Sequence, residues 1–160
     1  MRILLTKLWA YAVETVCAIV LCAIIWLTIG ADEVAAWQIQ KRPDLLVSIG
    51  IGAAVSGTIF AAYFALLSTE FGRKLRVHGV AVEYAAAFAF PMALLVMVAG
   101  TLEFSDKNTN LLLSRFITFL LCYSCVNCVT MIKNVIGLVH LWQDVDRSTE
   151  ARSLQGKGDA

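Results

Sequence analysis

Three evenly spaced cysteines, in the stretch CYSCVNC, are the residues of this sequence that most resemble a reactive site. Cys122, Cys125 and Cys128 stand at i, i+3 and i+6. On a helix they would share one broad face, about 120° wide. A zinc ion needs four tetrahedral ligands, which usually come from a loop and a second element. One helix cannot surround a metal in this way, and i, i+3 cysteines on a helix lack disulfide geometry.

The remaining metal-ligand residues do not complete a site either. Cys17 and Cys22 lie in an earlier apolar segment, and His78 and His140 lie at another depth. We therefore expect reduced, inert cysteines that pack as small apolar side chains, with no metal and no cofactor. The sequence also has no P-loop, HExxH or GxSxG motif, so it predicts a protein that is not an enzyme. A net charge of +1 gives no electrostatic support for direct nucleic acid binding.

Three ionisable residues inside or beside long apolar stretches are the next candidates. Glu14 lies in the first stretch, Glu83 near the start of the third, and Lys133 late in the fourth. Charges in a membrane are costly and mark function by default. We expect these three residues at one level of the membrane. Two interpretations remain open: an ion-pair cluster that orients the helices, and a vestibule that conducts ions or relays protons.

The elements that must position these residues follow from the composition. Of the 160 residues, 59% are hydrophobic and 16% charged, well outside the usual range of soluble domains. Each of four apolar stretches is long enough for a helix that spans a membrane. We expect an all-α membrane protein with a four-helix bundle in residues 1–142 and a polar, loose tail in residues 143–160. The predicted spans are residues 8–29, 45–67, 80–99 and 111–142.

The orientation follows from the basic residues. Basic side chains gather near both chain ends and in the second loop, which carries Arg73, Lys74 and Arg76. Because Lys and Arg accumulate on the cytoplasmic side, we expect both termini and this basic loop in the cytoplasm. The short loops favour a multi-pass protein of the bacterial inner membrane, with lipid as its surroundings. We expect Arg115, near the outer end of the fourth span, to reach outward or to pair with Glu103 or Asp106.

Small residues recur at four-residue intervals in the second and third spans. Gly52 and Ser56 belong to one such stripe, and Ala81, Ala85 and Ala89 to the other. Such stripes let helices approach closely. They favour either packing within one chain or contacts between copies, so a homo-oligomer, such as a tetramer, is one expected state.

The fourth stretch is longer than a membrane requires. As one helix from 110 to 142 it would measure roughly 50 Å, against about 30 Å of hydrocarbon. Its last turns would then project into the cytoplasm. Two interpretations are open: docking of a cytoplasmic protein partner, and an amphipathic piece lying on the inner leaflet. The residues that would form the docking surface are Val135, Ile136, Val139 and Trp142.

In number and arrangement of helices, the chain resembles the four-helix membrane subunit of the Kiwa phage-defence system. That resemblance implies a membrane protein that works with a cytoplasmic DNA-binding effector, and it assigns no role to an individual residue. The sequence thus predicts an oligomeric sensor or anchor that recruits a cytoplasmic effector in anti-phage defence. The alternatives are a small ion channel or transporter, and a stand-alone superinfection-exclusion or toxin-immunity protein.

Overall fold

Four long helices carry the apolar stretches of the sequence. The computed structural model describes residues 2–105 and 110–158, and the side chains of residues 11–105, 110–145 and 147. The long helices are α1 (Arg2–Thr28), α3 (Arg42–Leu67), α5 (Ala81–Phe104) and α6 (Leu111–Gly158). All four are long and apolar enough to cross a membrane, as expected for a multi-pass membrane protein.

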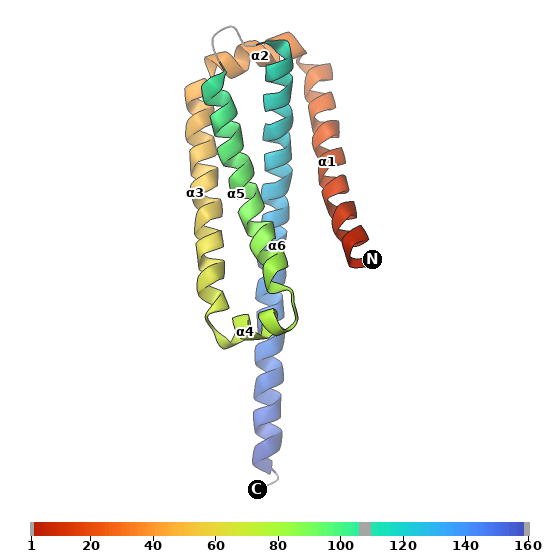
Figure 1. The fold of residues 1–160 in the computed structure, drawn as a ribbon, viewed down its shortest axis with the longest axis vertical. Coiled ribbons are helices and arrows are strands. Elements are labelled where there is room, and N and C mark those ends of the chain that lie inside the picture. The colour runs from red at the N-terminus through yellow and green to blue at the C-terminus, as the bar shows by residue number, and fades with distance from the viewer. Residues whose placement is uncertain (1, 106–109, 159–160) are drawn as a thin grey trace.

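The long helices lie side by side in a row. Across Figure 1 their order is α3, α5, α6, α1. The main contacts join α3 to α5, α5 to α6, and α6 to α1. Helix α6 therefore has α5 on one side and α1 on the other, and it is the helix on which the site is built.

The small-residue stripes lie at contacts within the chain. A Cβ atom added at Gly52 would stand 3.3 Å from Leu95 Cδ1 of α5. Ser56 is 1% exposed. Ala81 and Ala85 belong to a cluster with Tyr63 and other aromatic residues, and Ala89 is half-buried. Packing within one chain thus accounts for much of both stripes.

Two short helices replace segments that the sequence predicted as loops. Helix α2 (Ala31–Gln40) crosses one end of the row, and α4 (Glu70–Val77) lies at the other end (Figure 1). Gly30, with φ of 96°, precedes α2, and Gly79, with φ of 73°, follows α4. Both angles are in the left-handed region, which glycine adopts at no steric cost, so the chain can turn sharply there.

The expectation of a loose tail was wrong. Helix α6 continues without a break to Gly158 and is 48 residues long. Its sequence after Val145 is polar but rich in residues that tolerate a helix, such as Glu, Ala, Arg, Leu and Gln. The beginning of α1 and the end of α6 both lie away from α2 (Figure 1).

Candidate functional site

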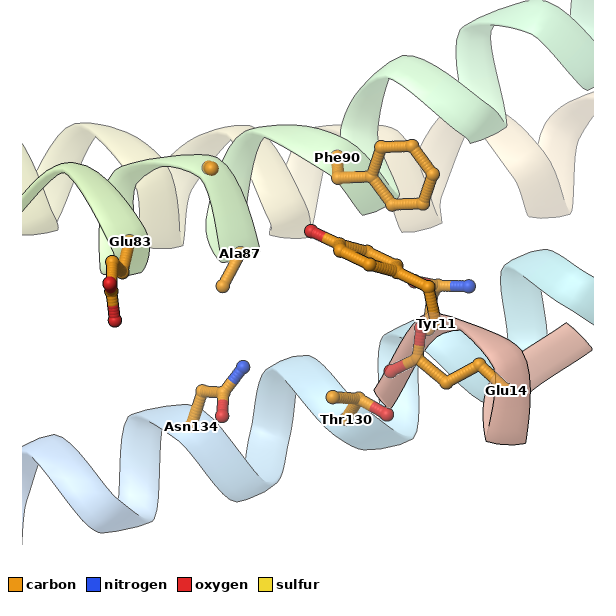
Figure 2. Close-up of a pocket in the computed structure, with 9 residues that line it drawn as sticks. Tyr11, Glu14, Glu83, Ala87, Phe90, Thr130 and Asn134 are labelled. Atoms are coloured by element: carbon orange, nitrogen blue, oxygen red, sulfur yellow. The ribbon is translucent and has the colours of Figure 1, made fainter. Parts of the chain in front are cut away.

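A polar pocket opens between α1, α5 and α6. Its volume is about 260 Å³. Figure 2 shows the three helices converging on it from different sides. It is lined by Tyr11 and Glu14 from α1, Glu83, Ala86, Ala87 and Phe90 from α5, and Asn127, Thr130 and Asn134 from α6.

Helical spacing explains why these residues meet. On α6, Asn127, Thr130 and Asn134 stand at i, i+3 and i+7, which is one face of a helix. Glu83 and Phe90, seven residues apart, share a face of α5 in the same way. The pocket thus forms where three polar faces of otherwise apolar helices point toward one another.

An aromatic pair closes one wall of the pocket. The rings of Tyr11 and Phe90 meet edge to face, with centroids 5.9 Å apart. Phe90 also contacts Tyr123 of α6, at 6.1 Å. Phe90 therefore touches an aromatic residue on each of the other two helices, and Tyr11 holds α1 against α5.

The two carboxylates occupy different levels of the pocket. Glu14 lies beside Thr130, and Glu83 lies opposite Asn134, in Figure 2. Thr130 and Asn134 are four residues apart on α6, a rise of about 6 Å. Glu83 is the more exposed of the two acids and stands in the first turn of α5, where a negative charge is favourable.

Glu14 is the less exposed acid of the pair. Its Oε2 atom is fully buried and has no hydrogen-bond partner among the residues that the structure describes. Nearby Asn127 is 4% exposed, and its Nδ2 donates to the Tyr123 carbonyl oxygen at 2.9 Å. Oε2 therefore has no surface that water or a molecule in the pocket can touch.

The three charges predicted at one level do not all meet. Glu14 and Glu83 line the same pocket, but Lys133 is exposed and is not among its lining residues. Lys133 stands one residue before Asn134, about 100° away around α6. Glu14 and Glu83 lie close enough in depth to line the same pocket. Lys133 does not line it, because this residue lies on another side of α6.

The predicted docking residues are covered only in part by the rest of the chain. Val135 packs against the cluster that contains Phe71 and Tyr63. The ring of Trp142 stacks on Phe71 of α4, with centroids 6.1 Å apart. Val139 lines a separate apolar pocket together with Val135 and Trp142.

Ile136 lies about 60° around α6 from Val139, and the four residues together cover an arc of about 120°. Ile136 continues the exposed apolar side of α6 that includes Val129 and Ile132, which are 68% and 55% exposed. These side chains have the positions expected for contact with lipid. Of the four predicted docking residues, Ile136, Val139 and Trp142 remain 54%, 45% and 50% exposed.

The basic loop is an amphipathic helix. In α4, Phe71 and Leu75 are buried, whereas Arg73 is exposed and forms an ion pair with Glu70 at 3.6 Å. Arg76 Nη1 donates to the Leu67 carbonyl oxygen at 2.6 Å. Lys74 is half-buried. The Arg76 bond fixes α4 against the end of α3, and Arg73 and Arg76 are exposed.

The five cysteines are dispersed over α1 and α6. All five are free. Cys22 and Cys122 are buried together with Ala18 at the contact between α1 and α6, whereas Cys17 and Cys125 are exposed. Among the described residues, no group of His, Cys, Asp and Glu side chains has the size needed to hold a metal ion. Cys22 and Cys122 thus act as small packing residues.

A buried hydrogen-bond network was not predicted. Gln38 of α2 is 4% exposed. Its Nε2 donates to Thr118 Oγ1 at 2.8 Å, and its Oε1 accepts from Ser114 Oγ at 2.8 Å. Val34 and Gln38, four residues apart, are the buried positions of α2, a spacing that is visible in the sequence. The network attaches α2 to α6.

Arg115 does not pair with Glu103, which was one of its two expected partners. Its guanidinium lies over the Trp26 ring of α1, 5.9 Å from the centroid. Glu103 instead pairs with Arg42 of α3, at 3.0 Å. Asp106 lies outside the described residues. Arg42 of α3 therefore pairs with Glu103 of α5. Arg115 instead joins α6 to α1.

Comparisons with protein-family models, with curated proteins and with solved structures find no match to this chain.

Proposed function

We propose that this chain is a non-catalytic, oligomeric anchor or sensor of the bacterial inner membrane that recruits a cytoplasmic protein. The observation that carries the proposal is the length of α6. The apolar sequence of α6 ends at Trp142, yet the helix continues to Gly158, about 24 Å further. A membrane span needs no such extension, whereas a soluble partner can bind along an exposed helix.

The basic face of α4 supports a cytoplasmic position for this extension. Arg73, Lys74 and Arg76 lie at the end of the row from which α6 extends (Figure 1). Basic residues beside spans accumulate in the cytoplasm. The resemblance to the Kiwa membrane subunit implies that the cytoplasmic partner is an effector of anti-phage defence.

Residues 146–158 are the docking segment of this proposal. They extend the predicted docking surface of Val135, Ile136, Val139 and Trp142, in which Ile136, Val139 and Trp142 are 54%, 45% and 50% exposed. Trp142, stacked on Phe71, marks the level at which α6 leaves the row. A partner would therefore contact α6 beyond this level, where its ribbon continues past α4 (Figure 1).

Ending the chain after Val145 should abolish partner recovery. The full chain, solubilised in detergent from native cells, should co-purify with a soluble protein in a complex of defined mass. The shortened chain should keep the mass of its own oligomer and lose that protein. A matched control replaces residues 146–158 with a Gly/Ser segment of equal length, which removes the helix and keeps the length.

Either of two results would refute recruitment by this segment. One is an undiminished partner with the shortened chain. The other is a full chain that purifies as an oligomer with no partner at all, in which case the channel function described next becomes the better account.

A small ion channel or transporter is the second candidate, because two carboxylates line a pocket within the membrane helices. However, the polar residues of α6 do not form a continuous polar path along one face of the helix. Thr118 and Asn127 are nine residues apart, which puts them about 180° apart around the helix. Cation flux in liposomes, reduced by Glu14→Gln, would support this candidate. Liposomes that stay ion-tight at all voltages and pH values would refute it.

A further inference from the structure

We propose that the exposed basic side of α4 binds the phosphate of an anionic phospholipid in the leaflet beside it. The proposal does not rest on partner recruitment by residues 146–158. It rests on the position of α4 between two spans, on the exposed residues Arg73 and Arg76, and on the exposed apolar residue Val77 next to them.

The chain holds α4 close to the ends of two spans. Ser68 and Thr69 join it to the end of α3, and residues 78–80 join it to the start of α5. Both α3 and α5 are long and apolar enough to cross a membrane. Helix α4 lies at the end of the row where α3 ends and α5 begins (Figure 1). Because these connections are so short, α4 lies near a membrane surface, at the level of the lipid headgroups.

A hydrogen bond fixes Arg76 at this level. Its Nη1 donates to the carbonyl oxygen of Leu67, the last residue of α3, at 2.6 Å. The last carbonyl groups of a helix have no partner within the helix and carry partial negative charge, so this bond is favourable. A guanidinium has five N–H donors, and this bond uses one of them. Arg76 is exposed and therefore presents further donors where the α3 span ends.

Arg73 adds a second guanidinium on the same side of α4. Arg73 and Arg76 stand three residues apart, and both are exposed. Arg73 forms an ion pair with Glu70 at 3.6 Å, but the two side chains are 70% and 69% exposed. Water screens such a pair, so a phosphate can take the place of the carboxylate. Three basic residues and one acidic residue give α4 a positive charge, and arginine binds phosphate through parallel N–H bonds.

An exposed apolar residue favours a lipid over a free anion. Val77 is 79% exposed and lies four residues after Arg73, on the same side of α4. Val82, in the first turn of α5, is 78% exposed. Basic residues beside exposed apolar residues are typical of helices at the boundary between headgroups and acyl chains. A phospholipid contacts both kinds of side chain, since one molecule carries a phosphate and acyl chains.

The test is a titration of the full chain, purified in a maltoside detergent, with short-chain phosphatidylglycerol or with phosphatidylcholine of equal chain length. Native mass spectrometry counts the bound lipids. Phosphatidylglycerol should bind more tightly, and Arg73→Gln should weaken its binding about fivefold, the effect of one basic residue beside an anionic surface. Arg73→Lys keeps the charge and should retain the preference. Binding of phosphatidylcholine should be the same in all three chains.

The matched control changes a basic residue at the other end of α3. Lys41 is exposed and pairs with Asp44 three residues later, as Arg73 pairs with Glu70 three residues earlier. Lys41→Gln should leave the binding of phosphatidylglycerol unchanged. Folding is not at issue in Arg73→Gln, because the ion pair that it removes lies within α4.

Four results would overturn the proposal. The first is equal affinity for the two lipids, which would leave the basic side of α4 to an acidic protein surface. The second is an unchanged preference in the double variant Arg73→Gln/Arg76→Gln. The third is an equal loss with Lys41→Gln, which would show a general effect of charge. The fourth is displacement of phosphatidylglycerol by inorganic phosphate at a similar concentration, which would show a site for the free anion.

Discussion

Replacing Gly72 with alanine lowers the free energy of unfolding by about 3 kcal/mol, the upper part of the range for overpacked sites. A Cβ atom there would stand 2.5 Å from the carbonyl oxygens of Leu66 and Leu67. These are backbone atoms at the end of α3, so no side-chain rotation relieves the clash. Helix α4 must move away, and the contact between Phe71 and Trp142 is then lost.

The measurement is unfolding by SDS titration in mixed micelles, with thiol labelling of the buried Cys22 and Cys122 as the signal. Gly137→Ala is the matched control. Gly137 is also a helical glycine, and a Cβ atom there meets nothing within 4 Å. Because alanine favours a helix, this control should be neutral or more stable by up to about 1 kcal/mol. Equal stability of the two variants would show that α4 does not pack against α3 in this way.

Replacing Gln38 with leucine detaches α2 from α6 and costs about 2 kcal/mol, because hydrogen bonds between membrane helices contribute about 0.6 to 1.7 kcal/mol each. Gln38 bonds to Thr118 Oγ1 and to Ser114 Oγ, both at 2.8 Å. Leucine makes neither bond. It also leaves the Thr118 and Ser114 hydroxyls without their partner on α2.

Thiol labelling again measures the result. Cys122 lines a pocket together with Gln38 and Thr118, so loss of α2 should speed its reaction with a maleimide. Gln40→Leu, an exposed position on the same helix, should leave the rate unchanged. A double-mutant cycle with Thr118→Val should show a coupling energy of about 1 kcal/mol. Additive effects of the two substitutions would mean that Gln38 and Thr118 do not interact.

The long helices could be predicted from the sequence because length and hydropathy alone determine a membrane span. The predicted starts and ends of residues 45–67 and the start at 111 agree closely with α3 and α6. Helices α2 and α4 were missed because each is short and mixed in polarity. In each of these helices, a pair of buried residues four positions apart is the sequence pattern that indicates a helix. The pairs are Val34 with Gln38, and Phe71 with Leu75.

The site could be predicted only in part. Depth along each span placed Glu14 and Glu83 together. Depth could not place Lys133, since the rotation of α6 depends on which face packs against α5. The aromatic wall of Tyr11 and Phe90 joins helices far apart in sequence, and nothing local in the chain indicates that pairing.

The orientation of the four spans is the claim on which the docking segment depends. It can be tested by labelling single cysteines in a chain whose five native cysteines are replaced. Asp32→Cys, Ser68→Cys and Arg147→Cys all lie at exposed positions. A membrane-impermeant maleimide added to spheroplasts should label Asp32→Cys at once, and should label Ser68→Cys and Arg147→Cys only after lysis. Labelling of Ser68→Cys and Arg147→Cys in intact spheroplasts, with Asp32→Cys protected, would contradict the account.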